Sequence, residues 1–303
     1  MPTQNLKIGM IGLDTSHVIA FTDLLHNEQH SYHVPGGEVV AAYPGGSPDF
    51  PASSSRIEGF TTELRDKYRV RIVDNIRDIP ETCDAILLES VDGRVHLSQF
   101  RKIVEFGKPV FVDKPFVLTS HDAKEMVRLA QAYGTPLMSC SALRFSEALI
   151  SALSVNNGGR VTGCDTFGPM AIEPTQPGVF WYGIHCVEML FAVLGPDCVS
   201  VRAITNEDYD EIVGVWSDGR IGTIRGNRIG NSQFAAILHR EKSIQYVDIS
   251  GCDKPFYASL LENIIQFFQT GVPTCDLEMT CRIVHFMEQA NKSRPSGEIL
   301  SLI

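Results

Sequence analysis

The sequence predicts a two-domain α/β protein. A Rossmann-type doubly wound parallel sheet is expected over residues 1–141, and an α+β domain with a mostly antiparallel sheet over residues 142–303. The length of 303 residues exceeds the usual size of one domain. Up to Cys140, short apolar runs alternate with helix-period segments, which is typical of parallel α/β sheets. Beyond Cys140, β-rich runs gather and the helices stand apart, as in α+β domains.

Six apolar runs predict the strands of the parallel sheet. Each run is nearly continuous rather than alternating, as expected for strands that are buried on both faces. The runs are LKIGMIGL (6–13), EVVAAY (38–43), VRIV (70–73), DAILLES (84–90), PVFV (109–112) and PLMSC (136–140). Right-handed crossovers are expected to connect them.

Three segments between these runs carry an apolar stripe at helical spacing. The stripes are Val18, Phe21, Leu24 and Leu25, then Leu97, Phe100, Ile103 and Val104, then Ala123, Met126, Val127 and Ala130. The second stripe ends before Gly107 and Pro109. Residues 43–56 are rich in Pro, Gly and Ser and are predicted to form a surface loop.

In the second domain, residues 210–226 hold two β-rich runs around the turn Ser217–Arg220, which predicts a hairpin. Residues 240–250 predict a further strand. Two helices are expected, over residues 187–193 and 257–268.

Composition excludes several classes of protein. Hydrophobic residues make up 44% of the chain and charged residues 20%, as in a packed globule. The formal net charge is -10 and there is no long basic run, so neither nucleic acid nor an anionic membrane is expected as a partner. No apolar run is long enough to cross a bilayer. Eight scattered cysteines without a C-x-x-C pair, and an N-terminus unlike a signal peptide, favour the cytoplasm.

The turn after the first strand departs from the dinucleotide fingerprint G-x-G-x-x-G. Aligned on Gly12, the chain has Asp14 at the second glycine and His17 at the third. Asp14 then places a carboxylate where a phosphate would bind. The alternative is that Asp14 or Thr15 is an ordinary helix N-cap.

The second strand ends at Tyr43, where NAD enzymes usually carry an acid for the ribose. The run Ser53–Arg56 is either a receptor for a 2′-phosphate or a solvated loop. Asp113 and Lys114 follow a buried strand at its carboxyl edge, where ligands of such sheets bind, although a surface lysine is the simpler alternative. His185 lies among aromatic residues near a helix start, where a buried structural histidine is the simpler alternative.

Taken in order, these segments resemble the Gfo/Idh/MocA oxidoreductases. IGMIGL is similar to the family's first strand and turn, and GKPVFVDKP to its "GKHVxxEKP" segment, with Asp113 in place of Glu. The run Leu143–Phe145 resembles the family's "RF", GVFWYGIH resembles the segment with its active-site histidine, and SRPSGEILSL resembles its ending.

The resemblance implies roles for individual residues. Lys114 matches the lysine beside the nicotinamide and His185 the acid/base histidine, with Tyr182 as a further proton donor. Trp181 stands where the family commonly has an Asp, and with Arg144 it is a candidate for holding substrate. No metal ligand is predicted. The candidate cofactor-binding residues are Gly12, Leu13, Asp14, Thr15, Ser16, His17, Tyr43, Glu89, His96, Asp113 and Lys114.

The function that this resemblance implies is oxidation of a sugar or polyol hydroxyl, or the reverse reduction, with NAD or NADP. The protein would be a homo-oligomer, either a dimer or a tetramer. Two alternatives remain open at this point. One is a redox-assisted glycoside lyase or hydrolase, and the other is a non-catalytic sugar-binding protein with a decayed nucleotide site.

Overall fold

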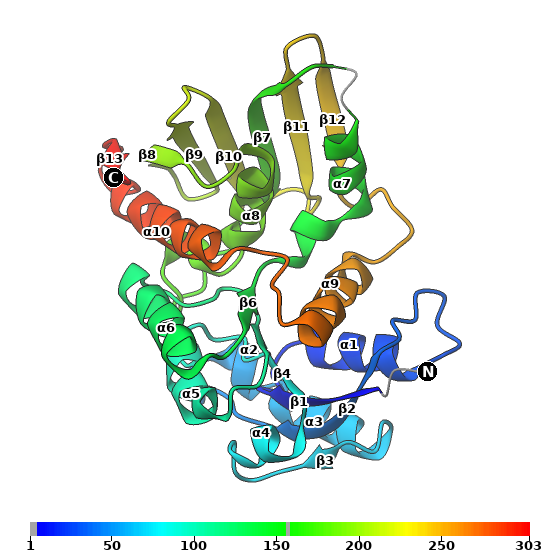
Figure 1. Ribbon diagram of the computed structural model, residues 1–303. Helices are drawn as coiled ribbons and strands as arrows, with labels where there is room; N and C mark the ends of the chain where they lie inside the picture. The colour runs from blue at the N-terminus through cyan, green and yellow to red at the C-terminus, as the bar shows by residue number, and fades with distance from the viewer. Residues whose placement is uncertain (1–4, 156–157) are drawn as a thin grey trace. The chain divides into compact units, whose positions relative to one another are not determined.

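The computed structural model describes residues 5–155 and 158–303. Residues 1–4, on which the expectation about a signal peptide partly rests, lie outside the described residues. The described chain forms two compact units (Figure 1). Unit 1 comprises the residues up to Val117, His121–Cys140 and Tyr257–Leu277, and unit 2 comprises Leu118–Ser120, Ser141–Phe256 and Glu278–Ile303.

Unit 1 contains the predicted parallel sheet, and all six predicted strands are present. They are β1 (Leu6–Ile11), β2 (Gly37–Tyr43), β3 (Arg71–Ile72), β4 (Ala85–Leu88), β5 (Val110–Val112) and β6 (Leu137–Ser139). The strand order is β3-β2-β1-β4-β5-β6 and every pairing is parallel. The order reverses between β1 and β4, which is where such sheets bind ligands. Strands β4, β5 and β6 are completely buried, which explains their unbroken apolar runs.

The three apolar stripes form the predicted helices α1 (His17–His26), α5 (His96–Ile103) and α6 (Ser120–Tyr133). A 3₁₀ turn, Val104–Phe106, extends α5 and ends at Gly107, whose φ of 65° is left-handed. Shorter helices complete the crossovers: α2 (Pro51–Ser54), α3 (Ile57–Asp66) and α4 (Asp78–Thr82).

The segment 43–56 is not the surface loop that its composition predicted. It contains α2, and Ser47, Phe50 and Ser53 are buried within it. The expectation was wrong because two serines of the segment hydrogen-bond buried carboxylates of other loops, which are described below.

Helix α9 (Phe256–Thr270) matches the predicted helix over residues 257–268. Almost all of it belongs to unit 1, so this unit takes in a segment that is distant in sequence. The ring of Tyr257 packs against His17 and Phe21 of α1, and Figure 1 shows the two helices side by side. The predicted domain boundary at residues 141/142 stays a prediction.

Unit 2 contains a seven-stranded sheet of order β12-β11-β7-β10-β9-β8-β13. Only the β7–β10 pairing is parallel, so the predicted antiparallel character is confirmed. The predicted hairpin is β9–β10. The strands are β7 (Val161–Pro169), β8 (Cys198–Thr205), β9 (Tyr209–Trp216), β10 (Ile221–Asn227), β11 (Ala235–Arg240), β12 (Ile244–Asp248) and β13 (Leu300–Ser301).

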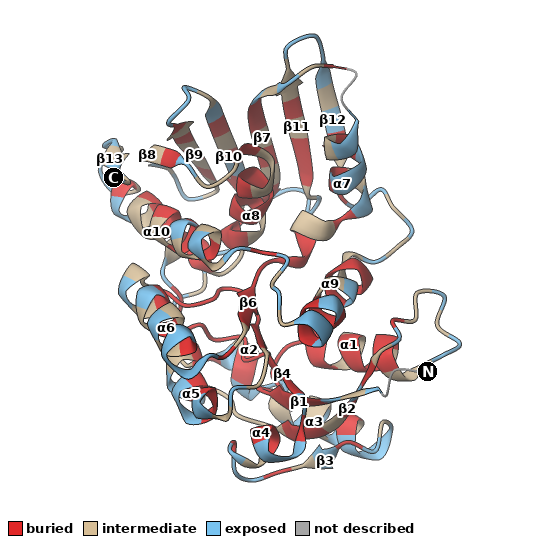
Figure 2. Ribbon diagram, viewed as in Figure 1, coloured by how far each residue is buried: buried red, intermediate tan, exposed pale blue. Residues whose placement is uncertain are grey.

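The helices of unit 2 are α7 (Glu147–Ser154), α8 (Gly183–Leu194) and α10 (Leu277–Ser293). Helix α8 packs against β7 and β10 and is buried along most of its length (Figure 2). Short 3₁₀ turns lie at Ala142–Phe145 and Gly178–Phe180. Within the described residues, no helix combines the length and hydrophobicity that crossing a bilayer requires.

Candidate active site

The turn after β1 requires glycine at position 12. Gly12 has a φ of 87°, and a Cβ there would lie 2.2–2.5 Å from atoms of Ser90. Its N–H donates to the carbonyl of Tyr43 at 3.0 Å, and the N–H of Leu13 donates to the carbonyl of Pro44 at 2.8 Å. Tyr43 therefore holds the turn through its backbone.

Asp14 joins three loops of unit 1. Its side chain is fully buried, and its carboxylate accepts a hydrogen bond from Ser53 Oγ at 2.6 Å and another from the N–H of Val91 at 2.9 Å. Burial raises the pKa of Asp14 above its usual range, and the two hydrogen bonds oppose that rise. The N-cap interpretation of Asp14 was wrong, because its carboxylate is directed to the other loops.

The first turn of α1 lacks a side-chain cap. Ser16 is the N-cap residue, and its side chain makes no cap hydrogen bond. Thr15, the other predicted cap, accepts a weak 3.5 Å bond from the N–H of His17. There is also no acidic residue in the first turn of α1. The positive end of the helix is thus left for a ligand.

A second buried acid was missed by the sequence analysis. Asp92 accepts a hydrogen bond from Ser47 Oγ at 2.6 Å and pairs with Arg94 at 2.8 Å. Arg94 also pairs with Asp49. The loops after β2 and β4 are therefore joined twice, through Asp14 and through Asp92. The available signal was a carboxylate four residues after a buried strand, together with a serine-rich segment.

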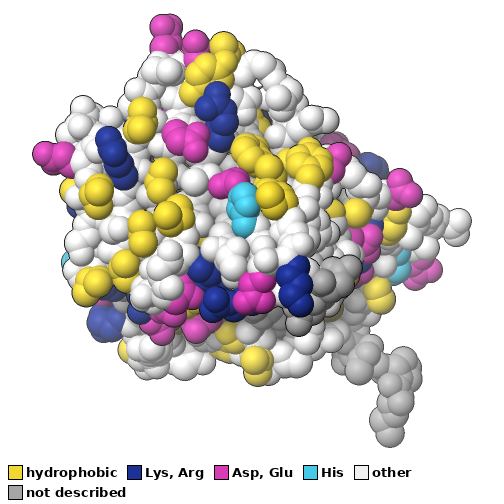
Figure 3. All heavy atoms as spheres, turned by 90° about the horizontal axis from the view of Figure 1, so that it is seen from above, with side chains coloured by type: hydrophobic (Ala, Val, Ile, Leu, Met, Phe, Trp, Pro, Cys, Tyr) yellow, Lys and Arg dark blue, Asp and Glu magenta, His cyan; other side chains and the backbone are white. Residues whose placement is uncertain are grey.

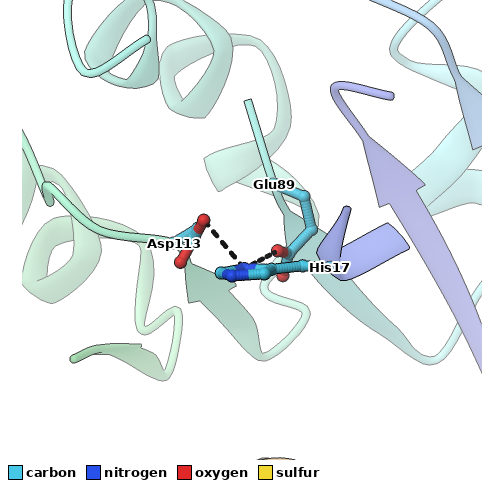
Figure 4. Close-up of side chains that lie close together, drawn as sticks. All are labelled: His17, Glu89 and Asp113. Atoms are coloured by element: carbon cyan, nitrogen blue, oxygen red, sulfur yellow. Dashed lines mark ion pairs between the residues drawn. The ribbon is translucent and has the colours of Figure 1, made fainter. Parts of the chain in front are cut away.

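His17, Glu89 and Asp113 converge at the carboxyl edge of the sheet (Figure 4). His17 begins α1, and the two acids follow β4 and β5 directly. His17 Nδ1 lies 3.0 Å from Asp113 Oδ2 and 3.4 Å from Glu89 Oε2, and all three side chains are buried. The sequence analysis named all three residues as cofactor-binding candidates, and the structure brings them together.

Burial and the mutual charges of this cluster shift its pKa values. Burial opposes a charge on His17, but Asp113 and Glu89 outweigh it and raise the pKa of His17 to about 9. Burial raises the pKa of Glu89. Asp113 is buried too, yet the adjacent His17 and Lys114 hold its pKa below the usual range.

Lys114 follows Asp113 and is 8% exposed, so it is not the surface cation of the simpler interpretation. His96, another cofactor-binding candidate, is fully buried. Its ring nitrogens lie 2.9 Å from the carbonyl oxygen of Phe116 and 2.6 Å from that of Ser90. His96 thus holds together the two loops that carry Glu89 and Lys114, and any direct contact with a cofactor stays a prediction.

This edge of unit 1 fits a dinucleotide. The cradle at Gly12 has no space for a Cβ, and the N-terminus of α1 is uncapped. A cavity of about 610 Å³ lies directly after β2, where the adenosine of a dinucleotide binds in such folds. The departure from the fingerprint is Asp14, whose carboxylate already accepts hydrogen bonds from Ser53 and Val91. The residues that line the cavity after β2 include Gly45, Gly46, Ser47, Ser54, Thr61, Thr62 and Arg65.

The other predicted catalytic residues lie in unit 2. His185, in the first turn of α8, has its Nδ1 2.7 Å from Ser141 Oγ. The rings of Tyr182 and Phe234 pack edge-on against it, and Trp181 packs against Tyr182. Ser141 is thus within hydrogen-bonding distance of His185. Sequence analysis missed Ser141, although it follows a buried strand two residues after that strand ends.

Arg144 pairs with a buried acid on α8. Its Nη1 lies 2.7 Å from Glu188 Oε2, and these side chains are 11% and 3% exposed. Burial raises the pKa of Glu188, and Arg144 opposes the rise. Glu188 was the one charged residue in the apolar run CVEMLF, one helical turn after His185, and that position was a usable signal.

Comparison with known proteins agrees with this geometry. Residues 6–140 match the model of the GFO_IDH_MocA oxidoreductase family, described as an NAD-binding Rossmann fold. The match covers less than half of the 303 residues, and over this N-terminal part the chain is similar to the Gfo/Idh/MocA oxidoreductases. The predicted NAD-binding Rossmann type is thereby confirmed.

Individual relatives are distant. The uncharacterized oxidoreductase YhhX of Escherichia coli is 24% identical over 151 residues, a match that spans 45% of this chain and 43% of YhhX. A probable dehydrogenase from Thermotoga maritima superposes with a TM-score of 0.80 at 17% identity, covering 98% of this chain and 99% of its own. The myo-inositol dehydrogenase of Lactobacillus casei, solved with NAD(H) and myo-inositol, has a TM-score of 0.77 at 15% identity, covering 99% and 97%. These structures show the same fold over the described units.

Proposed function

We propose that the protein is an NAD- or NADP-dependent oxidoreductase that acts on a hydroxyl group of a sugar or polyol. The observation that carries the proposal is the edge of unit 1, where an uncapped helix, the Gly12 cradle and a buried lysine lie at the switch point of a family-matched Rossmann sheet. The solved myo-inositol dehydrogenase supports the substrate class by analogy.

When bound, the dinucleotide would accept or donate the hydride. The backbone of residues 12–16 and the cavity after β2 would hold its phosphates and adenosine. Lys114 would stabilise the developing alkoxide. His185, oriented by Ser141, would take the hydroxyl proton, and Tyr182 would be the alternative donor. Trp181 and Arg144 would contact the substrate.

The first experiment is native mass spectrometry of the purified protein with NAD or NADP, followed by a screen of polyols and sugars for nicotinamide reduction. A bound dinucleotide and a reduced product support the proposal. Binding with glycoside cleavage but no net reduction would favour the lyase alternative. Absence of binding at high micromolar concentrations of both dinucleotides would overturn the proposal and favour a non-catalytic sugar-binding protein.

The variant Lys114→Met separates chemistry from binding. It keeps the length of the side chain and removes its charge, so kcat should fall about a hundredfold or more while dinucleotide affinity changes little. Lys108→Met, in the same segment but ahead of β5, is the matched control. Equal kcat for wild type and Lys114→Met would remove this role from Lys114.

We also propose that the protein forms a homo-oligomer through the open face of the unit 2 sheet. Ile244 and Tyr246 of β12 are 72% and 62% exposed, and a hollow of about 470 Å³ lies over the neighbouring strands. Figure 3 shows exposed hydrophobic side chains interspersed with charges of both signs. Light scattering should give a dimer or tetramer that Tyr246→Asp dissociates, and a monomeric wild type would refute this assembly.

A further inference from the structure

Within the described part of unit 1, five of the polar side-chain atoms that are buried without a hydrogen bond belong to one cluster. They are His17 Nδ1, both carboxylate oxygens of Glu89 and both of Asp113. The three residues are 5%, 0% and 1% exposed. Buried carboxylates normally accept several hydrogen bonds, because desolvating them without partners is costly. Two such carboxylates around one imidazole nitrogen offer a set of ligand atoms that a bound cation would satisfy.

The distances within the cluster match a coordination sphere. Metal–ligand distances of about 2.1 Å at angles between about 90° and 109° place two ligand atoms about 3.0–3.4 Å apart. His17 Nδ1 lies 3.0 Å from Asp113 Oδ2 and 3.4 Å from Glu89 Oε2. One ligand atom from each residue lies within 4.8 Å of the others, so all three can reach one ion with small side-chain adjustments.

We propose that His17, Glu89 and Asp113 bind one divalent transition-metal cation, of the class of Zn²⁺, Mn²⁺ or Fe²⁺. Two carboxylates and a neutral imidazole supply two negative charges, which a divalent ion balances in a buried site. The imidazole ligand selects against Mg²⁺ and Ca²⁺, which prefer oxygen ligands alone. Three protein ligands leave positions open for water or for an oxygen atom of a substrate.

Regular secondary-structure elements position all three ligands. Each of them lies at the end of a regular element of the same sheet layer, namely the start of α1 and the ends of β4 and β5. The ring of Tyr257 packs edge-on against the His17 ring, with centroids 4.7 Å apart, and restricts its rotation. Lys114, which follows Asp113 directly, also lowers the pKa of both acids through its charge.

A proton on His17 is the competing way to complete the cluster. In that arrangement the imidazolium bridges the two acids and no metal binds. The two arrangements differ in one direct observable, the metal content of the folded protein. They also differ in which ions change its stability, since a cation that binds only the folded state raises the melting temperature.

The test is elemental analysis of protein purified without chelator, and then titration calorimetry of chelator-treated protein with ZnCl₂, MnCl₂ and MgCl₂, all without dinucleotide. We expect about one transition-metal ion per chain, and binding of Zn²⁺ or Mn²⁺ at least about a hundredfold tighter than that of Mg²⁺. Metal-free purified protein that also fails to bind Zn²⁺ and Mn²⁺ would overturn the proposal. Because dinucleotide is absent, this result is independent of the proposed oxidoreductase function.

Substitution of each carboxylate ligand tests whether the metal binds at this cluster. Glu89→Gln and Asp113→Asn keep the shape of each side chain and should weaken Zn²⁺ or Mn²⁺ binding at least about tenfold, with loss of the metal-dependent rise in melting temperature. His239→Gln is the matched control, since His239 pairs with Asp165 at 2.6 Å in unit 2. Circular dichroism checks folding. Unchanged metal binding in both folded carboxylate variants would place the ion elsewhere and refute this site.

Discussion

Ser53 donates a 2.6 Å hydrogen bond to the carboxylate of Asp14, and this bond joins the segment after β2 to the turn after β1. The same serine accepts a hydrogen bond from the N–H of Ser47 at 2.9 Å. Asp14, which replaces a glycine of the fingerprint, thus has its partner in the segment 43–56, which was predicted to be a surface loop. The same hydrogen bond therefore accounts for the burial of Asp14 and for the burial of Ser53.

Removing the Asp14 carboxylate should destabilise unit 1. In Asp14→Ala the N–H of Val91 and the hydroxyl of Ser53 lose their acceptor, which costs about 1–3 kcal/mol in the free energy of unfolding. Asp14→Asn keeps an oxygen and a polar group at these positions and should lose less. Urea denaturation measures both. An alanine variant as stable as wild type would show that these two bonds contribute nothing.

The raised pKa of Asp14 predicts how stability depends on pH. A carboxyl group whose pKa is higher in the folded than in the unfolded state contributes stability that is fully present below its unfolded value, about 4, and is lost as pH rises through the folded value. The stability of wild type relative to Asp14→Asn should therefore fall as pH increases from about 4. Urea denaturation of both proteins over this range measures it, and a difference that is independent of pH would contradict the raised pKa.

Gly12 should not tolerate alanine. Its φ of 87° disfavours an L side chain, and the added Cβ would overlap Ser90. Gly219 has nearly the same φ, 86°, but open space around it. Gly219→Ala therefore isolates the conformational cost of about 1 kcal/mol, and Gly12→Ala should cost clearly more and weaken dinucleotide binding. Equal losses of unfolding free energy in the two variants would mean that the overlap with Ser90 does not destabilise the protein.

Variants of His185 and Ser141 should distinguish a catalytic role of His185 from a positioning role of Ser141. His185→Ala is expected to abolish turnover with dinucleotide affinity nearly unchanged. Ser141→Ala removes the 2.7 Å contact to His185 Nδ1 and should lower kcat about tenfold, with Ser141→Thr restoring most of it. Steady-state kinetics and dinucleotide titrations measure both effects. Near-normal kcat in a folded His185→Ala protein would rule out its role as the acid/base.

The Arg144–Glu188 pair predicts a strong coupling. Arg144→Met leaves the carboxylate of Glu188 buried without its cation and should cost about 3–5 kcal/mol. Adding Glu188→Gln should recover much of this loss, because the charge that required compensation is gone. The exposed pair Arg282–Glu278 on α10 is the control, with a coupling under about 1 kcal/mol. Additive losses at Arg144 and Glu188 would contradict a direct interaction between them.

Local sequence patterns were enough to predict the layered architecture. Continuous apolar runs such as residues 85–88 and 110–112 predicted buried parallel strands, because only a strand covered on both faces can be apolar at every position. Helical stripes and the Ser217–Arg220 turn were also local signals, and they gave α1, α5, α6 and the β9–β10 hairpin. Asp113 and Lys114 were placed at the ligand-binding edge for the same reason, since they directly follow a recognisable strand.

The contacts between polar side chains could not be predicted from local sequence and are known from the folded structure. His17, Glu89 and Asp113 are separated by 72 and 24 residues in the chain, and no spacing rule links them. They converge because parallel strands direct their carboxyl ends to one edge, where the next helix begins. Asp14 with Ser53, and His185 with Ser141, are pairs of the same kind. Local propensity specifies elements, whereas contacts between loops depend on how the sheet brings distant strand ends together.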